Sequence, residues 1–375
     1  MKNACGYGWL AENKPTKQTP TAMHPRILPV PLSTAVVAAL ATCVSLTATP
    51  ARGADGPYRV LATSQTLGTG GIDYVAADSD ERRVYVPRGS QVLVFDLDSL
   101  KQVGAITNTS AHGVAIDAAA HHGFSSSSPV AMWDTRTLAP IKTITVQGRP
   151  DGIFNEPLTG RIYVLSHSAP NVTVLDAKDG TQVGTIDLGG APEQAAGDGE
   201  GNVYVDIEDK DQVAVVDAKT LKVTAHYDLG GKGRTPAGLA LDAKNHVLFV
   251  LCREPAVAVM LDARDGKCLG TVPIGQGTDG GTFNPATLEA FSSQRNGTLS
   301  VIKETSPTTF DLAQTVQTKP GAKTCTFDAK TGHVVLIAIE AAPPAAGQPA
   351  PAEGEGRKGR GRGGPGLLDL IVVGK

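Results

Sequence analysis

The sequence predicts an all-β chain folded as a seven-bladed β-propeller, and three observations support this fold class. A pattern of four short strands returns about every 40 residues, the repeat length typical of a propeller blade. Each repeat has one Asp or Asn at the end of its first strand, and these marks lie 38 to 44 residues apart. No amphipathic helix of useful length separates the strands. The marks are Asp78, Asp117, Asn155, Asp198, Asp242, Asn284 and Asp328.

Each repeat divides into four strands, which we denote a to d in chain order. In the third repeat, strand a covers residues 152–154, strand b 161–165, strand c 171–176 and strand d 182–186. The turn at residues 177–180 contains Asp-Gly, a strong hairpin signal between strands c and d. Strands b and c are apolar on both faces, as sheets packed between two neighbouring sheets require. The other repeats follow the same order.

The seventh repeat lacks a strand d, because the chain stops after its strand c at residues 367–373. An orphan strand at residues 58–62 precedes the first repeat. We predict that it closes blade seven as strand d, which leaves no open sheet edge. Between strands b and c of this repeat, residues 341–366 are rich in Ala, Pro and Gly. We expect a disordered loop there, on the face of a propeller where ligands usually bind.

The N-terminal part of the chain has the layout of a targeting segment, which we place at residues 1–53. A basic start beginning at Met23, the apolar stretch 36–46 and small residues after it are typical of a signal peptide, with Met23 as the true start. The apolar stretch is too short for a comfortable membrane span, and Cys43 only faintly resembles a lipoprotein site. We therefore expect a periplasmic or secreted protein whose propeller covers residues 54–375.

Charge and cysteine content narrow the function classes. Residues 54–375 contain 29 basic and 36 acidic residues, and an acidic body argues against broad nucleic-acid binding. Cys252 and Cys268 fall at opposite ends of one predicted blade, too far apart to bridge, and Cys325 belongs to another repeat. We expect no structural disulfide, no membrane span and a monomer stabilised by its core.

The strand motifs resemble those of one known family. Val/Ile-Tyr-Val strands and Val-x-Val-apolar-Asp strands at this spacing resemble the YVTN-type bacterial β-propellers, the YncE-like family, over roughly residues 55–375. Residues 201–210, 291–301 and 371–375 look similar to exported members. The family is related to the propellers of cytochrome cd1-type nitrite reductases and of haem d1 biosynthesis, and most members have no assigned reaction. Residues 124–129 depart from the Asn-Gly loop that the family prefers.

The first candidate site is a ring of positions where strand a enters the central channel. These positions lie five residues before the marks, or four in the third repeat, and are occupied by Asp73, His112, Asp151, Glu193, Ala237, Asp279 and Lys323. A ring of carboxylates around one axis focuses negative potential and could hold a small ligand or a cation. His112 could be a haem or metal ligand. The alternative is that these side chains cap backbone groups at strand starts.

A second candidate group lies in the b–c loops of the same face and forms a rim around the ring. It consists of Arg88, His167, Arg253 and Arg295. Together with Lys323 these residues could bind an anionic group such as a carboxylate or phosphate; otherwise they are solvated loop charges. His121 and His122 lie in an a–b turn on the opposite face, and adjacent strand residues point to opposite sides, so we expect no metal pair there.

The leading functional hypothesis is a non-catalytic ligand- or protein-binding scaffold of the cell envelope, with a small ligand or an envelope protein as partner. No cofactor is predicted, because motifs for covalent haem, serine hydrolases, zinc proteases and P-loops are absent from the sequence. Two alternatives remain open: a lactonase-like hydrolase with a divalent metal in the channel, and a haem d1-handling protein with His112 as ligand. A nucleic-acid binder using the basic residues 357–362 is a weaker alternative.

Overall fold

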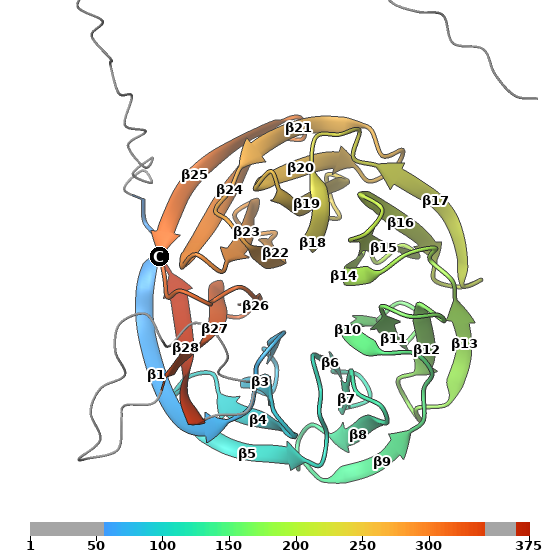
Figure 1. The fold of residues 1–375 in the computed structure, drawn as a ribbon, viewed down its shortest axis with the longest axis vertical. Coiled ribbons are helices and arrows are strands. Elements are labelled where there is room, and N and C mark those ends of the chain that lie inside the picture. Colours follow the sequence, from blue (N-terminus) through green and yellow to red (C-terminus); the bar gives the residue numbers. More distant parts are fainter. Residues whose placement is uncertain (1–55, 342–364) are drawn as a thin grey trace, which may run out of the picture. The chain divides into compact units, whose positions relative to one another are not determined.

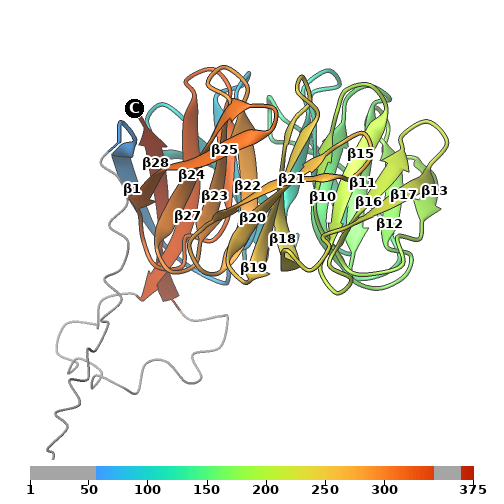
Figure 2. The same cartoon turned by 90° about the horizontal axis from the view of Figure 1, so that it is seen from above.

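The computed structural model describes residues 56–341 and 365–375, and its regular elements there are all strands. They form seven four-stranded antiparallel sheets, which stand around a central channel as the blades of a propeller (Figure 1). The strands of every blade run between the same two faces of the ring (Figure 2). The predicted fold class is therefore confirmed. The predicted targeting segment 1–53 and the basic residues 357–362 lie outside the described residues.

Blades one to four are each built from four consecutive strands. Blade one contains β2 (Ala76–Asp78), β3 (Arg83–Arg88), β4 (Gln91–Asp96) and β5 (Gln102–Thr107). Blade two contains β6 (Val114–Asp117), β7 (His122–Ser125), β8 (Val130–Asp134) and β9 (Pro140–Ile144). Blade three contains β10 (Pro150–Glu156), β11 (Arg161–Ser166), β12 (Val172–Asp176) and β13 (Gln182–Ile186). Blade four contains β14 (Pro192–Gly197), β15 (Asn202–Ile207), β16 (Gln212–Asp217) and β17 (Lys222–Asp228).

Blades five and six repeat this order, and blade seven joins the two ends of the described chain. Blade five contains β18 (Arg234–Asp242), β19 (Val247–Glu254), β20 (Val257–Asp262) and β21 (Cys268–Pro273). Blade six contains β22 (Thr278–Asn284), β23 (Glu289–Gln294), β24 (Thr298–Ser306) and β25 (Thr309–Gln317). Blade seven contains β26 (Cys325–Asp328), β27 (His333–Ala341), β28 (Pro365–Gly374) and, outermost, β1 (Arg59–Thr69).

The pairing of β1 with β28 confirms that the N-terminal strand closes blade seven. The two strands are antiparallel, with Arg59 opposite Gly374 and Thr69 opposite Pro365. β1 is longer than the predicted strand at residues 58–62. The strands β27 and β28 also take in the two edges of the loop predicted at 341–366, whose interior lies outside the described residues.

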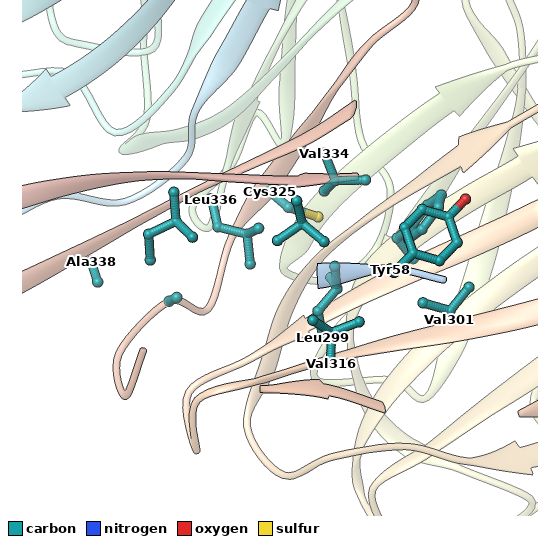
Figure 3. Packing of buried hydrophobic residues seen from close by; sticks show 12 residues of the cluster. Tyr58, Leu299, Val301, Val316, Cys325, Val334, Leu336 and Ala338 are labelled. Atoms are coloured by element: carbon teal, nitrogen blue, oxygen red, sulfur yellow. The ribbon is translucent and has the colours of Figure 1, made fainter. Parts of the chain in front are cut away.

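Burial follows the place of each strand in its blade. The inner strands β3 and β4 are almost wholly buried, whereas the outermost strand β5 is mostly exposed. The buried apolar residues form seven clusters, one at each contact between neighbouring blades. Figure 3 shows the cluster between blades six and seven, which contains Leu299 and Val301 of blade six, Val334 and Leu336 of blade seven, and Tyr58. Each blade therefore buries its two faces against two neighbours.

The Asp and Asn marks of the sequence close the turns between the first and second strands. The Oδ1 atom of Asp78 accepts hydrogen bonds from the backbone N–H groups of Asp80 and Glu81 at 3.1 and 3.0 Å. The marks of five other repeats accept the same kind of bond from the turn that follows them. Short polar side chains suit this place because they satisfy the free backbone donors of a tight turn.

The third repeat uses Glu156 instead of Asn155. The Glu156 carboxylate accepts the N–H groups of Leu158 and Thr159, both at 2.9 Å, while Asn155 donates its side-chain amide to a neighbouring blade. Counted from Glu156, the ring residue Asp151 lies five positions back, as in every other repeat. The irregular spacing in this repeat therefore reflects the choice of mark and not a shifted strand.

The three cysteines of the described residues are free thiols. Cys252 and Cys325 are buried, whereas Cys268 is exposed. Burial raises the pKa of the Cys252 thiol to about 12, which keeps it protonated and unreactive at neutral pH. The described propeller is accordingly held together by packing, sheet pairing, hydrogen bonds and ion pairs.

Candidate functional site

The ring residues lie together at one mouth of the central channel, where six blades each contribute a polar side chain. His112 Nδ1 lies 2.8 Å from Asp73 Oδ2 and 3.0 Å from Asp151 Oδ1. Lys323 Nζ lies 2.7 Å from Asp73 Oδ1 and also contacts Asp279. These ion pairs link blades six, seven, one, two and three in a continuous chain. Ala237 of blade five, the seventh ring position, is buried.

Three of the four predicted rim residues join the ring residues at this mouth. His167 Nε2 lies 3.1 Å from Asp151 Oδ2 and 3.7 Å from Glu193 Oε1. The Arg253 guanidinium contacts the carboxylates of Asp279 and Glu208 and lies 4.0 Å from Glu193. Arg295 is 64% exposed in its side chain, and its Nη2 lies 3.9 Å from Asp279 Oδ2. The ring and the rim therefore form one charged cluster, which we call the channel mouth.

The structure corrects the expectation for Arg88, which does not belong to the channel mouth. Its side chain is buried, and its Nη2 donates to the carbonyl oxygen of Gly366 at 2.7 Å. Its other nitrogens donate to the carbonyl oxygens of Thr66 and Thr69 at 3.3 and 3.4 Å. Arg88 therefore fastens blade one to the closing strand β1 and to the start of β28.

One residue of register explains this difference. The rim residue His167 lies four positions after Tyr163, the aromatic residue of its second strand, whereas Arg88 lies only three positions after Tyr85. Side chains alternate between the two faces of a strand, so a shift by one turns Arg88 away from the mouth. The same rule finds Glu208, four positions after the aromatic residue of blade four, which the sequence analysis missed. Glu208 is the partner of Arg253.

A set of hydrogen bonds crosses the channel below the mouth, and no repeated feature of the sequence predicts these bonds. The Tyr74 hydroxyl of blade one donates to Glu193 Oε2 of blade four at 2.8 Å. The Gln194 amide donates to the carbonyl oxygen of Gly281 at 2.9 Å, and its Oε1 accepts the N–H groups of Leu239 and Gly281 at 2.9 and 3.0 Å. These bonds join blades four, five and six, so the channel mouth rests on a cross-linked base.

Two hollows open at the channel mouth. The Arg295 hollow has a volume of about 430 Å³ and is lined by Gly71, Gly89, Arg295 and Lys323, among others. The Arg149 hollow has a volume of about 440 Å³ and is lined by Ser127, Ser128, Arg149, Asp151 and His167, among others. Asp73, Ser110 and His112 line both hollows. Arg149 was not among the predicted site residues, since it lies two positions before the ring residue of its repeat.

Ion pairing shifts the pKa values of the histidines and their carboxylates in opposite directions. The hydrogen bonds to Asp151 and then to Asp73 raise the pKa of His112 to about 10. The hydrogen bond to Asp151 likewise raises the pKa of His167. Burial raises the pKa of Asp151, but hydrogen bonds from both histidines outweigh it, so that the pKa is lowered. The same balance, with His112 and Lys323 as partners, lowers the pKa of Asp73.

Two further carboxyl groups at the base of the mouth are pushed toward the neutral form. Burial, with the nearby charges of Asp206 and Glu208, raises the pKa of Glu193 well above its usual range. Burial also raises the pKa of Asp206 to about 7, although its Oδ1 accepts the backbone N–H of Gln194 at 2.6 Å. At neutral pH the mouth therefore holds fewer negative charges than its carboxyl groups would suggest.

Two groups of side chains at the mouth combine imidazole and carboxylate donors. Asp73, His112 and Asp151 form the first, and Asp151, His167 and Glu193 the second; in each, the donor atoms lie within 4.8 Å of one another. Mixed sets of this kind suit divalent transition metals, and Asp151 is common to both. In the part of the chain that the structure describes, no helix is long and apolar enough to span a membrane.

Comparisons with known proteins identify the fold but not a family. No protein-family model matches the chain, and no curated protein matches it. A solved structure of U3-55K matches with a TM-score of 0.61 at 12% identity, covering 81% of this chain and 98% of that chain. A chain in a crystal structure of the mitotic checkpoint complex matches with a TM-score of 0.65 at 14% identity, covering 82% and 96%.

These likenesses concern architecture alone. At 12% and 14% identity they carry no information about ligands or reactions. As many as 1647 solved chains match this chain, so the fold by itself does not select a function. Membership of the YncE-like family stays a prediction from the strand motifs.

Proposed function

We propose that this chain is an exported, YncE-like β-propeller that acts as a non-catalytic binding protein of the cell envelope. Its binding site is the channel mouth, and its ligand is a small anion with a carboxylate or phosphate group. One observation carries the proposal: basic side chains gather at the mouth of a propeller that is acidic as a whole. They are His112, Arg149, His167, Arg253, Arg295 and Lys323.

The charge balance at the mouth supports an anionic ligand. Six carboxyl groups lie at the mouth or directly beneath it: Asp73, Asp151, Glu193, Asp206, Glu208 and Asp279. Burial moves Glu193 toward the neutral form and leaves Asp206, with a pKa of about 7, only partly ionised at neutral pH, so the six basic side chains face fewer negative charges than the six carboxyl groups would give. Residues 54–375 as a whole contain 29 basic and 36 acidic residues. A positive mouth on an acidic body concentrates small anions at the site.

The rigidity of the mouth also favours binding over catalysis. Asp279 holds Arg253 and Lys323, and His112 is held between Asp73 and Asp151, so these three basic groups are fixed before a ligand arrives. Fixed groups lose little conformational entropy on binding. The sequence carries no motif for an activated nucleophile, which leaves recognition as the role that these groups support best.

Thermal stabilisation by simple anions tests this function. Inorganic phosphate, acetate and a panel of organic acids should raise the melting temperature by several degrees in low-salt buffer. The double variant Arg149→Gln/Arg295→Gln should lose this response, because both exposed guanidinium groups are gone. Arg136→Gln is the matched control, since Arg136 is 57% exposed in its side chain and lies in the turn between β8 and β9. An equal response in the double variant, or no response to any anion, would overturn the proposal.

Export is supported by the composition of residues 1–53. Fusion of residues 1–60 to a reporter enzyme that is active only outside the cytoplasm tests it. Activity should depend on the apolar stretch 36–46, and two charged substitutions within that stretch should abolish it. Activity that survives those substitutions would argue against a signal peptide.

A divalent metal is the second candidate ligand, and it would make a lactonase-like hydrolase conceivable. The two mixed groups that share Asp151 favour it, with His112 and His167 as nitrogen donors. Zinc or manganese should then bind at one equivalent or more, as measured by titration calorimetry and metal analysis. The double variant His112→Ala/His167→Ala should lose the metal, whereas His246→Asn should keep it. Metal content that is unchanged in the double variant would remove this candidate and the hydrolase with it.

Haem d1 is a further candidate that rests on the family resemblance. His112 Nδ1 faces the carboxylates of Asp73 and Asp151, and its Nε2 has no hydrogen-bond partner among the described residues, so Nε2 would be the nitrogen that holds such a cofactor. A visible absorption spectrum of protein from its native envelope tests this cofactor. A haem band that His112→Ala removes supports it, and a colourless preparation contradicts it. The nucleic-acid alternative depends on residues 357–362, which lie outside the described residues.

A further inference from the structure

We propose that the ligand of the channel mouth carries two anionic groups, which bind in two subsites on either side of His112. This inference rests on the proposed function and deepens it, because it names the class of ligand. The first subsite is the Arg295 hollow and the second is the Arg149 hollow. The ligand class is a short dianion, either a dicarboxylate or a bisphosphate.

The first argument is the arrangement of the hollows. Asp73, Ser110 and His112 line both of them, so the two hollows adjoin along these residues. Their volumes of about 430 and 440 Å³ are nearly equal. A water molecule takes about 30 Å³ in the liquid, so either hollow has room for a carboxylate or phosphate group with several further atoms. One ligand can therefore extend across His112 from one hollow into the other.

The second argument is that each hollow has one exposed arginine whose side chain makes no direct hydrogen bond to a carboxylate of the described residues. Arg295 is 64% exposed in its side chain and approaches only Asp279, at 3.9 Å. Arg149 is exposed and pairs with no carboxylate among residues 56–341 and 365–375. Arg253 and Lys323, by contrast, directly contact carboxylates. A guanidinium group binds a carboxylate or phosphate with two parallel hydrogen bonds, so the two exposed guanidinium groups can hold two anionic groups.

The third argument is the supply of further donors between and beside the arginines. The His112 side chain is 46% exposed, and its Nδ1 is held by Asp73 and Asp151. Its Nε2 makes no hydrogen bond to any described residue and is free to donate to a ligand that crosses the ring. The hydroxyl groups of Ser110, which is shared by the hollows, and of Ser128 in the Arg149 hollow also make no hydrogen bond in the described part of the chain. Donors are thus available at both ends and in the middle.

The test compares ligands that differ in the number and spacing of their anionic groups. Linear dicarboxylates from malonate to azelate, monocarboxylates of matching length and α,ω-bisphosphates are titrated by calorimetry into the chain that begins at residue 54. The best dicarboxylate or bisphosphate should bind at least tenfold more tightly than its monoanionic counterpart. Affinity should pass through a maximum with chain length, because a ligand must be long enough to reach from one arginine to the other across His112. The tighter of the two dianion series identifies the headgroup.

Single variants assign the two subsites. Arg149→Gln and Arg295→Gln should each lower dianion affinity about tenfold, close to the level of monoanions, while changing monoanion affinity only about twofold. Gly71→Phe should fill the Arg295 hollow and remove the preference for dianions. A Cβ atom at Gly71 would meet no atom within 4 Å, so this variant should fold. The distant Arg136→Gln should behave as the unchanged protein.

The outcomes separate this proposal from the binding function itself. Equal affinities for monoanions and dianions, or dianion binding that either single arginine variant leaves unchanged, would overturn the two-subsite proposal while the anion-binding function stands. A failure of all the anions to bind would overturn both. Length-dependent binding that needs both arginines supports both.

Discussion

At the scale of single residues, position within the repeat decides what a side chain does. The residue five positions before the Asp, Asn or Glu that closes the first turn of a blade belongs to the ring at the channel mouth. In blades three to six, the residue four positions after the aromatic residue of the second strand belongs to the rim. Arg88 misses the rim position by one residue and is buried against carbonyl groups instead. In the third repeat Glu156, and not the mark Asn155, closes the turn after the first strand. Charge is therefore a weaker guide to a site than register, because neighbouring strand positions face opposite ways.

The ionised state of His112 predicts that stability falls at alkaline pH. Its pKa is about 10 in the folded protein against an ordinary value of 6.5, mainly through its hydrogen bond to Asp151. A group whose pKa is raised on folding contributes fully below its unfolded pKa and loses that contribution as pH rises toward its folded pKa. The melting temperature should therefore fall between pH 6.5 and 10. Because the side chain is 46% exposed, we expect a contribution of only about 1 kcal/mol.

Variants isolate this contribution from that of other groups. His112→Asn should show a shallower fall in melting temperature between pH 6.5 and 10 than the unchanged protein. His246→Asn is the control, since His246 makes no ion pair in the described part of the chain, and it should keep the original slope. Parallel pH profiles for the unchanged protein and His112→Asn would contradict the assignment.

At the scale of elements, each sheet is completed by its neighbours, and blade seven also needs both ends of the described chain. Tyr58 precedes β1 and is anchored in blade six. Its backbone N–H donates to Gln314 Oε1 at 3.0 Å, and its hydroxyl donates to Glu289 Oε2 at 2.5 Å. Lys375 Nζ lies 3.2 Å from the same carboxylate and 4.9 Å from the centre of the tyrosine ring. The first and last parts of the propeller thus meet at one residue of blade six.

Tyr58 should therefore contribute more to stability than any other residue near the start of β1. Tyr58→Ala removes a buried aromatic ring from the cluster in Figure 3 and should lower the free energy of unfolding by about 3–5 kcal/mol. Arg59→Ala is the matched control, because Arg59 is exposed, and should change stability by less than about 0.5 kcal/mol. Chemical denaturation measures both. Similar losses of unfolding free energy in the two variants would mean that Tyr58 does not stabilise the contact between β1 and blade six.

Arg88 provides a second fastening of β1, from the side of blade one. Arg88→Met should keep most of the buried volume but leave the carbonyl groups of Thr66, Thr69 and Gly366 without this donor. We expect a loss of about 1–3 kcal/mol in unfolding free energy, because the buried carbonyl group of Gly366 would be left without this donor. The exposed Lys101→Met serves as the control for a lost positive charge. A loss no greater than that of Lys101→Met would refute this role.

At the scale of the whole propeller, stability depends on the closed ring. Seven clusters fill seven contacts between blades, so no blade has a free face. The strand β1 covers the outer edge of β28 and thereby ties the first blade to the last. Closure also sets the site, because the channel mouth takes its side chains from all seven blades and only a complete ring brings them to one axis.

Removal of the closing strand tests this dependence. A chain that begins at residue 70 lacks β1 and leaves the edge of β28 unpaired, whereas a chain that begins at residue 54 keeps both. The shorter chain should melt at least about 10 °C lower and associate through its open edge. Calorimetry and light scattering measure the two effects. Equal melting temperatures with a monomeric shorter chain would show that blade seven is stable with three strands.

Periodicity along the chain was enough to predict the number of blades, the strands within them and the closing role of the N-terminal strand. It also predicted six ring residues and three rim residues that meet at the mouth. These features depend on interactions between residues close in sequence, since every repeat shows the side-chain alternation of strands and the polar residues of tight turns. Each repeat shows four strand segments in the sequence. The seventh repeat shows only three, which indicated that its fourth strand had to come from the N-terminal segment.

Only the folded chain revealed which of these side chains pair and what lies between them. Tyr74 and Glu193 meet across 119 positions of sequence, and Arg88 reaches Gly366 across 278. These contacts are not repeated in the other blades, so no periodic pattern in the sequence predicts them. Whether Arg149 and Arg295 bond directly to a carboxylate likewise depends on where the carboxylates lie in space. Local regularity builds the blades, whereas the long-range balance of charge and burial at their common axis makes the site.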